Sequence, residues 1–141
     1  MPPPQTFRIA GRRQNVPVAR RRVRSTLSDW GAPAELIERA TLLAGELVAN
    51  AVTHCRVSHA LIEVALTLRG DDLTLEVWDP DRDRLPRPRR AGPHEEGGRG
   101  LALVAELADT WGHRQGPYTK CVWARFTLAR RPGRADAPAG S

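Results

Sequence analysis

The sequence predicts an α+β fold in which helices cover one face of a largely antiparallel sheet. Two segments of the first half, Val16–Trp30 and Pro33–Cys55, have the periodicity of amphipathic helices. Two later pairs of segments alternate apolar and polar residues around short turns, as hairpins do. The predicted order is a strand, two helices, two strands, a long loop, a short helix and two strands.

Length and composition limit the classes of function. The chain has 141 residues, 40% of them hydrophobic, which suits a single packed domain. A formal net charge of +6 would favour nucleic acid. However, the positive charge is almost entirely arginine, and aromatic residues make up only 5%, so platforms for stacking bases are scarce. We therefore expect no nucleic-acid partner.

No segment predicts secretion, a membrane span or a disulfide framework. No apolar run approaches the ~18 residues of a transmembrane helix, and Met1–Arg13 lacks the apolar core of a signal peptide. Cys55 and Cys121 have no metal-ligand spacing and form no framework. We expect a cytoplasmic protein without a membrane partner.

The first third of the chain predicts an edge strand and a helix. Thr6–Ala10 is a candidate for the short strand. Asn15 can cap the following helix, Pro17 suits its first turn, and Gly31 can end it. The arginine run at 20–24 could contact phosphates, but a solvated helix face is the expected role.

The second predicted helix has a polar stripe at the border of its apolar face. Glu46, Asn50 and His54 follow one another at intervals of four residues, so they drift only slowly around the helix. Polar groups at the border of a buried face need partners, because burial without one costs ~1–3 kcal/mol each. The stripe either meets water at the rim or lines a pocket, and we favour the pocket.

Strict alternation places a carboxylate in the predicted core. The segments 60–68 and 73–79 form a hairpin around Arg69–Asp72, and the apolar residues from Leu73 to Val77 face the core. A period of two puts Asp79 on the same face. Because a buried aspartate is rare unless it is paired, Asp79 either binds the backbone of the next turn or accepts a hydrogen bond from a ligand.

The closing hairpin, 111–115 with 120–128, turns at Gly116-Pro117 and directs Val122 and its alternate neighbours inward. Trp123 and Trp78 face the other side of the sheet. Because exposed tryptophan is costly, we expect the N-terminal segment or a partner subunit to cover the two rings, as in a homodimer. The alternative is that they pack on each other and on Arg125.

The segment Asp81–Glu96 is rich in proline and charge, and loops of this length are usually lids or binding loops. It leads into Gly97–Gly100 and a short apolar helix, Leu101–Asp109. Glycines at a helix start let backbone amides approach an anion. Neither familiar phosphate loop fits, because no GK[ST] follows and no strand immediately precedes the glycines.

Taken in this order, the segments resemble the GHKL (Bergerat-fold) ATPases, which include gyrase B, histidine kinases, MutL proteins and certain heat-shock chaperones. ELVANAVTH is similar to their N box, Val77–Asp79 to the first G box and Gly98–Leu101 to the second. WGHR…YTKCVWARF resembles the branch of bacterial anti-sigma factors that are also serine-protein kinases. The resemblance implies a two-layer α/β sandwich with a mixed, largely antiparallel sheet at residues 16–128, between a lead at 1–15 and a disordered tail at 129–141.

The resemblance also implies ATP and Mg²⁺ as ligands. It assigns Glu46 as the general base, Asn50 as the Mg²⁺ ligand and Asp79 as the acceptor of the adenine amino group. The implied nucleotide-binding residues are Asn50, His54, Asp79, Asp81, Gly98, Arg99, Gly100, Leu101 and Thr119. Three features depart from the family pattern: Asp81 stands where glycine is common, the lid is short and rich in arginine and proline, and Tyr118–Lys120 stands where Gly-Gly or Gly-Thr is usual.

The implied function is that of an anti-sigma kinase, which holds a sigma factor and phosphorylates a serine of an anti-anti-sigma antagonist. The alternative is a partner-switch regulator that works by protein contact without catalysis, with or without nucleotide. A sensor histidine kinase is disfavoured because no helical segment or membrane span precedes the domain. A topoisomerase or repair ATPase is disfavoured because 141 residues leave no second domain.

Overall fold

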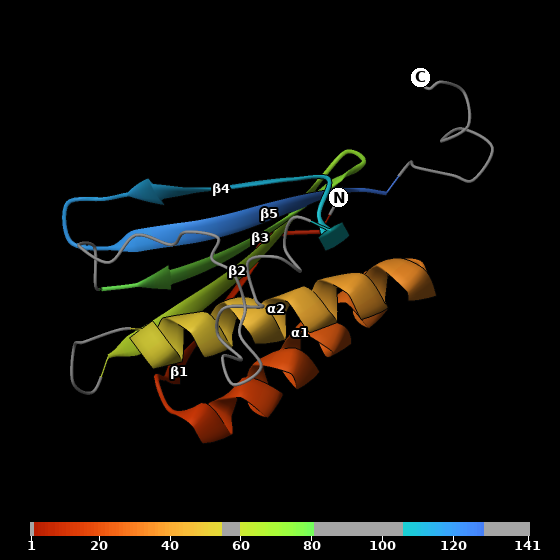
Figure 1. The fold of residues 1–141 in the computed structure, drawn as a ribbon. Coiled ribbons are helices and arrows are strands. Elements are labelled where there is room, and N and C mark those ends of the chain that lie inside the picture. The colour runs from red at the N-terminus through yellow and green to blue at the C-terminus, as the bar shows by residue number, and fades with distance from the viewer. Residues whose placement is uncertain (1, 55–59, 81–105, 129–141) are drawn as a thin grey trace.

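The computed structural model describes residues 2–54, 60–80 and 106–128. The elements within them follow the predicted order, and the α+β class with helices on one sheet face is confirmed (Figure 1). They are β1 (Gln5–Ala10), a 3₁₀ turn η1 (Arg13–Asn15), α1 (Val16–Asp29), α2 (Ala34–His54), β2 (Leu61–Arg69), β3 (Asp72–Asp79), β4 (Thr110–Gln115) and β5 (Lys120–Thr127). Of the predicted helix at 101–109, only Glu106 and Leu107 are both described and helical.

The five described strands form one sheet in the order β1-β2-β3-β5-β4, and every pairing is antiparallel. The predicted edge strand is confirmed as β1, which pairs with β2. Each predicted hairpin is also present, and the pairing of β3 with β5 joins the two hairpins at the centre of the sheet. Gly70 has a φ of +62° in the β2–β3 turn, a conformation that favours glycine.

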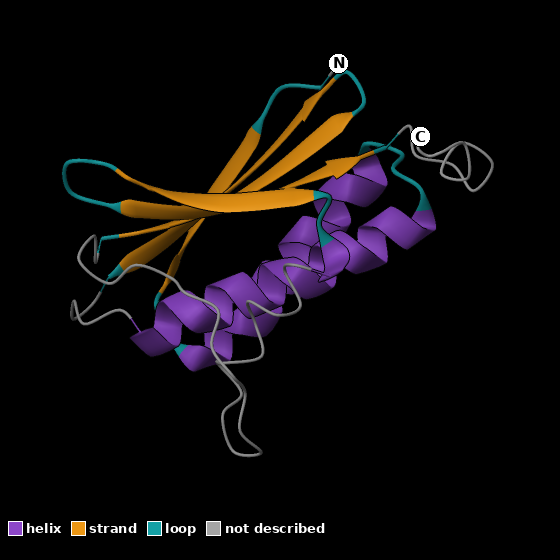
Figure 2. Ribbon diagram, turned by 45° about the horizontal axis from the view of Figure 1, so that its top comes forward, coloured by secondary structure: helices purple, strands orange, loops and turns teal. Residues whose placement is uncertain are grey.

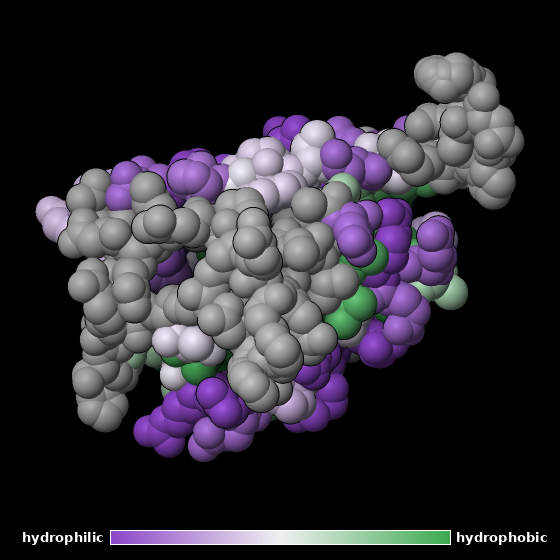
Figure 3. Space-filling model, viewed as in Figure 1, coloured by the Kyte–Doolittle hydropathy of each residue, from purple (hydrophilic) through white to green (hydrophobic). Residues whose placement is uncertain are grey.

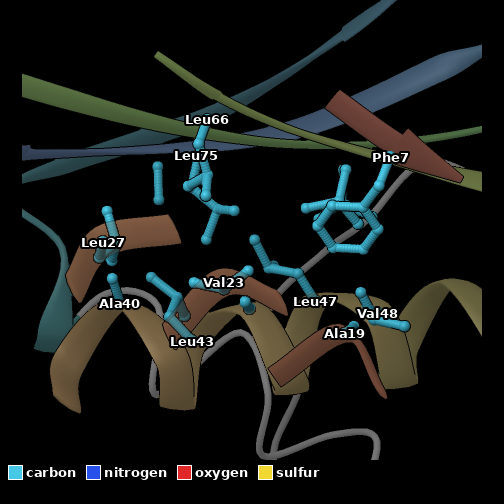
Figure 4. Packing of buried hydrophobic residues seen from close by; sticks show 14 of the residues in the cluster. Phe7, Ala19, Val23, Leu27, Ala40, Leu43, Leu47, Val48, Leu66 and Leu75 are labelled. Carbon is cyan, nitrogen blue, oxygen red and sulfur yellow. The ribbon is translucent and has the colours of Figure 1, made fainter. Parts of the chain in front are cut away.

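The two helices lie side by side under one face of the sheet, and Figure 2 shows this two-layer arrangement from a second direction. The inward side chains of the strands meet the apolar sides of α1 and α2, as Figure 4 shows. Val23, Leu43, Leu75 and Phe126 are each fully buried. Burying one such side chain contributes ~1.5–3 kcal/mol, so this layer of contacts provides most of the stabilisation.

The start of α1 differs from the prediction in one contact. Asn15 does precede the helix, but its side chain makes no capping hydrogen bond. Instead its Nδ2 donates to the carbonyl oxygen of Ala10 at 2.8 Å, so it connects the end of β1 to the start of α1. Gly31 follows the end of α1 with a φ of +76°, as predicted for a residue that ends a helix.

The arginines of α1 have protein partners as well as solvent. Arg24 forms an ion pair with Glu38 of α2 at 2.5 Å, and the guanidinium of Arg22 lies 4.6 Å from the ring centroid of Phe7. Figure 3 shows that the outer surfaces of the helices in this view are mainly hydrophilic. No helix among the described residues is long and apolar enough to span a membrane.

On the outward face of the sheet, each tryptophan lies beside an arginine. Arg114 is 5.4 Å from the ring centroid of Trp78, and Arg125 is 5.4 Å from that of Trp123. Trp123 also lies over Gly112, where a Cβ atom would come within 2.7 Å of the ring. The contact of Trp123 with Arg125, one part of the alternative, is confirmed. Strand β1 pairs at the edge of the sheet rather than over the rings, and a homodimer stays a prediction.

Cys121 is fully buried beneath this outward face, with Trp78 of β3 and Arg114 of β4 opposite it. Burial raises the pKa of the Cys121 thiol to about 12, and the nearby Glu76 carboxylate adds to the rise. Since the thiolate is the reactive form of cysteine, this thiol should be inert.

The inertness can be measured in a Cys55→Ser protein, in which Cys121 is the only cysteine. We expect iodoacetamide to leave native Cys121 unmodified at both pH 7 and pH 9, because the raised pKa keeps the thiol protonated throughout that range. In guanidinium chloride the same residue should react, and faster at pH 9. Intact-mass spectrometry gives the extent of reaction. Rapid alkylation of the native protein at pH 9 would contradict the burial.

Candidate functional site

Helix α2 carries the predicted polar stripe along the edge of its core-facing side. Leu43 and Leu47 are buried on that side, whereas Glu46 and Asn50 are half-buried. Residues four apart on a helix lie one above the other, about 6 Å apart along the axis at 1.5 Å per residue. The structure therefore brings Glu46 and Asn50 together, as predicted. His54 is the last residue of α2, and its side chain lies outside the described residues.

Asn50 has a buried oxygen atom that is not used within the described part of the chain. Its Oδ1 is shielded from solvent and accepts no hydrogen bond there. A buried acceptor without a hydrogen bond lowers the stability of the fold by ~1–3 kcal/mol. Asn50 Oδ1 is therefore a candidate for contact with a ligand. An amide oxygen is also a ligand type that Mg²⁺ accepts, with water and phosphates completing the shell. No group of three or more His, Cys, Asp or Glu side chains in the described segments could hold a metal alone.

A buried ion pair lies at the ends of two central strands. Asp79 is the last residue of β3 and Lys120 is the first residue of β5, and the two are directly opposite. Only 4% of Asp79 and 5% of Lys120 is exposed. The distance from Lys120 Nζ to Asp79 Oδ2 is 4.0 Å. The inward position of Asp79 is confirmed. Lys120 was missed as an inward residue, although the alternation counted back from Val122 could have found it.

Asp79 and Asn50 approach the same end of the molecule. In Figure 1 the arrowhead of β3 and the C-terminal part of α2 lie at one end, together with the start of β5. Glu46 lies one turn further from that end. The arrangement can hold a hydrogen-bonding ligand group at Asp79 and Lys120, and a cation or hydrogen-bond donor beside the Asn50 amide oxygen and the Glu46 carboxylate on α2.

Thr119 lies in the turn before β5 and lines a hollow. The backbone amide of Gly116 donates to the carbonyl oxygen of Thr119 at 2.7 Å, which closes the β4–β5 turn. A hollow of about 380 Å³ is lined by Arg8, Leu61, Glu63, Trp78, Asp79, Pro80 and Thr119. Most of these residues face away from the helices, and neither Glu46 nor Asn50 lines the hollow. It is therefore a concavity on the other side of the sheet.

Arg39 connects α2 to the segment before β4. Its Nη1 donates to the carbonyl oxygen of Leu107 at 3.0 Å, and its guanidinium lies 5.6 Å from the ring centroid of Phe126. These contacts fix the end of the chain segment that follows the predicted glycine-rich binding loop. No sequence pattern indicates this role, because Arg39 and Leu107 are 68 residues apart in the chain.

The remaining predicted site residues, Asp81 and Gly98–Leu101, lie outside the described residues. Their contacts with a nucleotide therefore stay predictions.

Comparisons with known proteins agree with this architecture. The family model described as histidine kinase-like ATPase domain matches residues 9–126. Among solved structures, the RsbU and RsbW domains of Rv1364c from Mycobacterium tuberculosis are similar, with a TM-score of 0.71 and 22% sequence identity. The similarity covers 92% of this chain but 34% of that one, so the chain spans about a third of its length. No curated protein is significantly similar to the chain.

The ion pair can be tested by a double-mutant cycle in urea at pH 7. Lys120→Met removes the cation opposite a buried carboxylate, and Asp79→Asn removes the anion opposite a buried ammonium. Each single change should lower the free energy of unfolding, by up to about 3–5 kcal/mol for a well-coupled buried pair. The double variant should lose much less free energy of unfolding than the sum of the losses in the two single variants. Strictly additive losses would show that the two groups do not interact.

Proposed function

The chain belongs to the histidine kinase-like ATPase domain family, and on that premise we propose that it binds ATP with Mg²⁺ and phosphorylates a serine of an anti-anti-sigma antagonist. The proposed domain spans residues 16–128, and the proposed partners are that antagonist and a sigma factor in the cytoplasm. The observation that carries the proposal is the buried Oδ1 of Asn50, which has no described partner and lies one helical turn from Glu46.

The polar groups fit a nucleotide and its metal. Asn50 would supply one oxygen to Mg²⁺, and the phosphates and water would supply the others, since Mg²⁺ keeps several waters in protein sites. When bound, the ion neutralises charge on the phosphates. Asp79, at the end of β3, would accept a hydrogen bond from the adenine amino group. Its position near the same end as Asn50 supports this orientation of the nucleotide.

Glu46 would act as the general base. Its carboxylate is half-buried on the same stripe as Asn50, so a hydroxyl group that approaches the last phosphate from that side would meet it. A carboxylate in hydrogen-bond reach can take up the proton of an attacking serine. The rest of catalysis would come from positioning and charge neutralisation, as is usual in phosphoryl transfer.

A second candidate is the partner-switch regulator without catalysis. The observation in its favour is Tyr118, which is 82% exposed at the tip of the β4–β5 turn. Aromatic residues are enriched in protein interfaces, and this turn is also where the sequence departs from the usual Gly-Gly or Gly-Thr of the family. Phosphotransfer to an antagonist distinguishes the two candidates.

The nucleotide assignment is tested by isothermal titration with ATP, with and without Mg²⁺. The parent should bind ATP more tightly when Mg²⁺ is present. In Asn50→Ala that tightening should largely vanish, because the metal loses a protein oxygen. Asn50→Asp keeps an oxygen ligand and is the matched control, in which the dependence on Mg²⁺ should persist. An equal response to Mg²⁺ in the parent and Asn50→Ala would remove Asn50 from the metal site.

The catalytic assignment is tested by transfer of radiolabelled phosphate to co-encoded antagonist proteins. Glu46→Gln keeps the size of the side chain but cannot take up a proton, so ATP should still bind while transfer falls by ~10²–10⁴-fold. Glu63→Gln, on the opposite face of the sheet, should transfer at the parental rate. Equal transfer by the parent and Glu46→Gln would refute the base assignment. No transfer by the parent to any antagonist would favour the partner-switch candidate.

A further inference from the structure

Lys120 combines features that a purely structural residue does not require. It is the only lysine in the chain, and it is 95% buried at the start of a central strand. Burying an ammonium group is costly unless the charge is paired. Within the described segments its ion-pair partner is the carboxylate of Asp79, at 4.0 Å. That distance corresponds to an ion pair and is too long for a hydrogen bond, so the carboxylate does not use the N–H donors of Lys120.

The pair presents an acceptor and a donor side by side at the place proposed for the nucleotide base. Asp79 offers carboxylate oxygens, and Lys120 offers N–H groups on a flexible four-carbon stem. Both side chains point inward from opposed residues of β3 and β5. A base that binds here therefore meets both kinds of group rather than a carboxylate alone.

We propose that Lys120 is a specificity-determining residue of the nucleotide site, which lets the site accept 6-oxo purines such as guanine as well as adenine. The inference rests on the proposed nucleotide-binding function. Adenine carries a 6-amino group, and Asp79 can accept a hydrogen bond from it. Guanine carries a 6-oxo acceptor beside an N1–H donor, so a carboxylate alone would repel its oxygen. Lys120 donates to that oxygen, while Asp79 accepts from N1–H.

The physical basis is the cost of an unmatched polar group. A site that is built to hydrogen-bond one substrate group rejects an analogue without that group by ~10⁴–10⁵-fold, because its buried polar atoms are left unpaired. With a donor and an acceptor both present, the 6-amino group of adenine finds Asp79 and the 6-oxo group of guanine finds Lys120, so neither purine has an unmatched group at position 6. The affinities for ATP and GTP should then lie within about tenfold of each other.

The alternative for Lys120 is neutralisation of Asp79 without contact to the base. If Lys120 only neutralises Asp79, its removal would change the affinities for all nucleotides alike, through the lost charge and the lower stability of the fold. A lysine that contacts the 6-oxo group would affect GTP and ITP more than ATP. The ratio of two affinities measured on one sample separates these roles, because the fraction of folded protein cancels from it.

The experiment is calorimetric titration with ATP, GTP and ITP, which has the 6-oxo group without the 2-amino group. In Lys120→Met, the affinities for GTP and ITP should fall relative to ATP by roughly 10- to 100-fold, the worth of a hydrogen bond to a charged group. Arg125→Met is the matched control. It removes the same charge from the same strand on the outward, exposed face, so its GTP-to-ATP ratio should equal that of the parent.

A second readout uses the parent protein only. Because the chain has a single lysine, selective ¹⁵N labelling gives one side-chain ammonium signal. That signal should move on addition of either ATP or GTP, to different positions. Two results would overturn the selectivity proposal alone. The first is a parent that binds ATP but binds GTP more than about 10³-fold more weakly. The second is a Lys120→Met variant whose affinities for ATP, GTP and ITP fall by the same factor. A parent that binds no nucleotide would overturn the proposed function as well.

Discussion

The packing of α2 against the inward face of the sheet determines where the described site residues lie. Leu43 and Leu47 are held among inward side chains of the strands, which fixes the rotation of the helix about its axis. With that rotation fixed, the edge of α2 that carries Glu46 and Asn50 cannot turn toward the core or toward solvent. The same layer of contacts aligns β3, so that Asp79 reaches the end of the sheet near the C-terminal part of α2.

Much of this arrangement could be predicted because it follows from local periodicity. The 3.6-residue repeat located α2 to within one residue at each end, and the period of two in β3 placed Asp79 inward. The contacts that could not be predicted are non-local. The pairing of β1 with β2 joins residues more than 50 positions apart, and the Asp79–Lys120 contact depends on the register of β3 with β5. Asn15 failed as a cap because the nearby carbonyl group of Ala10 is its partner instead.

The polar groups on the two faces of the sheet differ in how they are satisfied. On the outward face, Arg8 pairs with Glu63 and Arg114 with Glu76, and the tryptophan rings lie beside arginines. Inside, Asn50 Oδ1 has no described partner and Lys120 contacts Asp79 only at 4.0 Å. Incompletely matched polar groups in a core are expected mainly at functional sites. Asn50, Asp79 and Lys120 lie at the end of the molecule where α2 and the ends of β3 and β5 approach each other, although Thr41 Oγ1 and Arg39 Nε, nearer the start of α2, are also buried without a hydrogen bond among the described residues.

The strand order has a consequence for how the protein behaves at high concentration. Its two edge strands, β1 and β4, are six residues long each, whereas the three inner strands have eight or nine. Exposed edges are templates for pairing with another chain, and short, charged edges suppress such pairing. β1 carries Arg8 and β4 carries Arg114, both on the outward face. The sheet is therefore protected against growth by strand addition, which disfavours aggregation through its edges and leaves its faces for specific contacts.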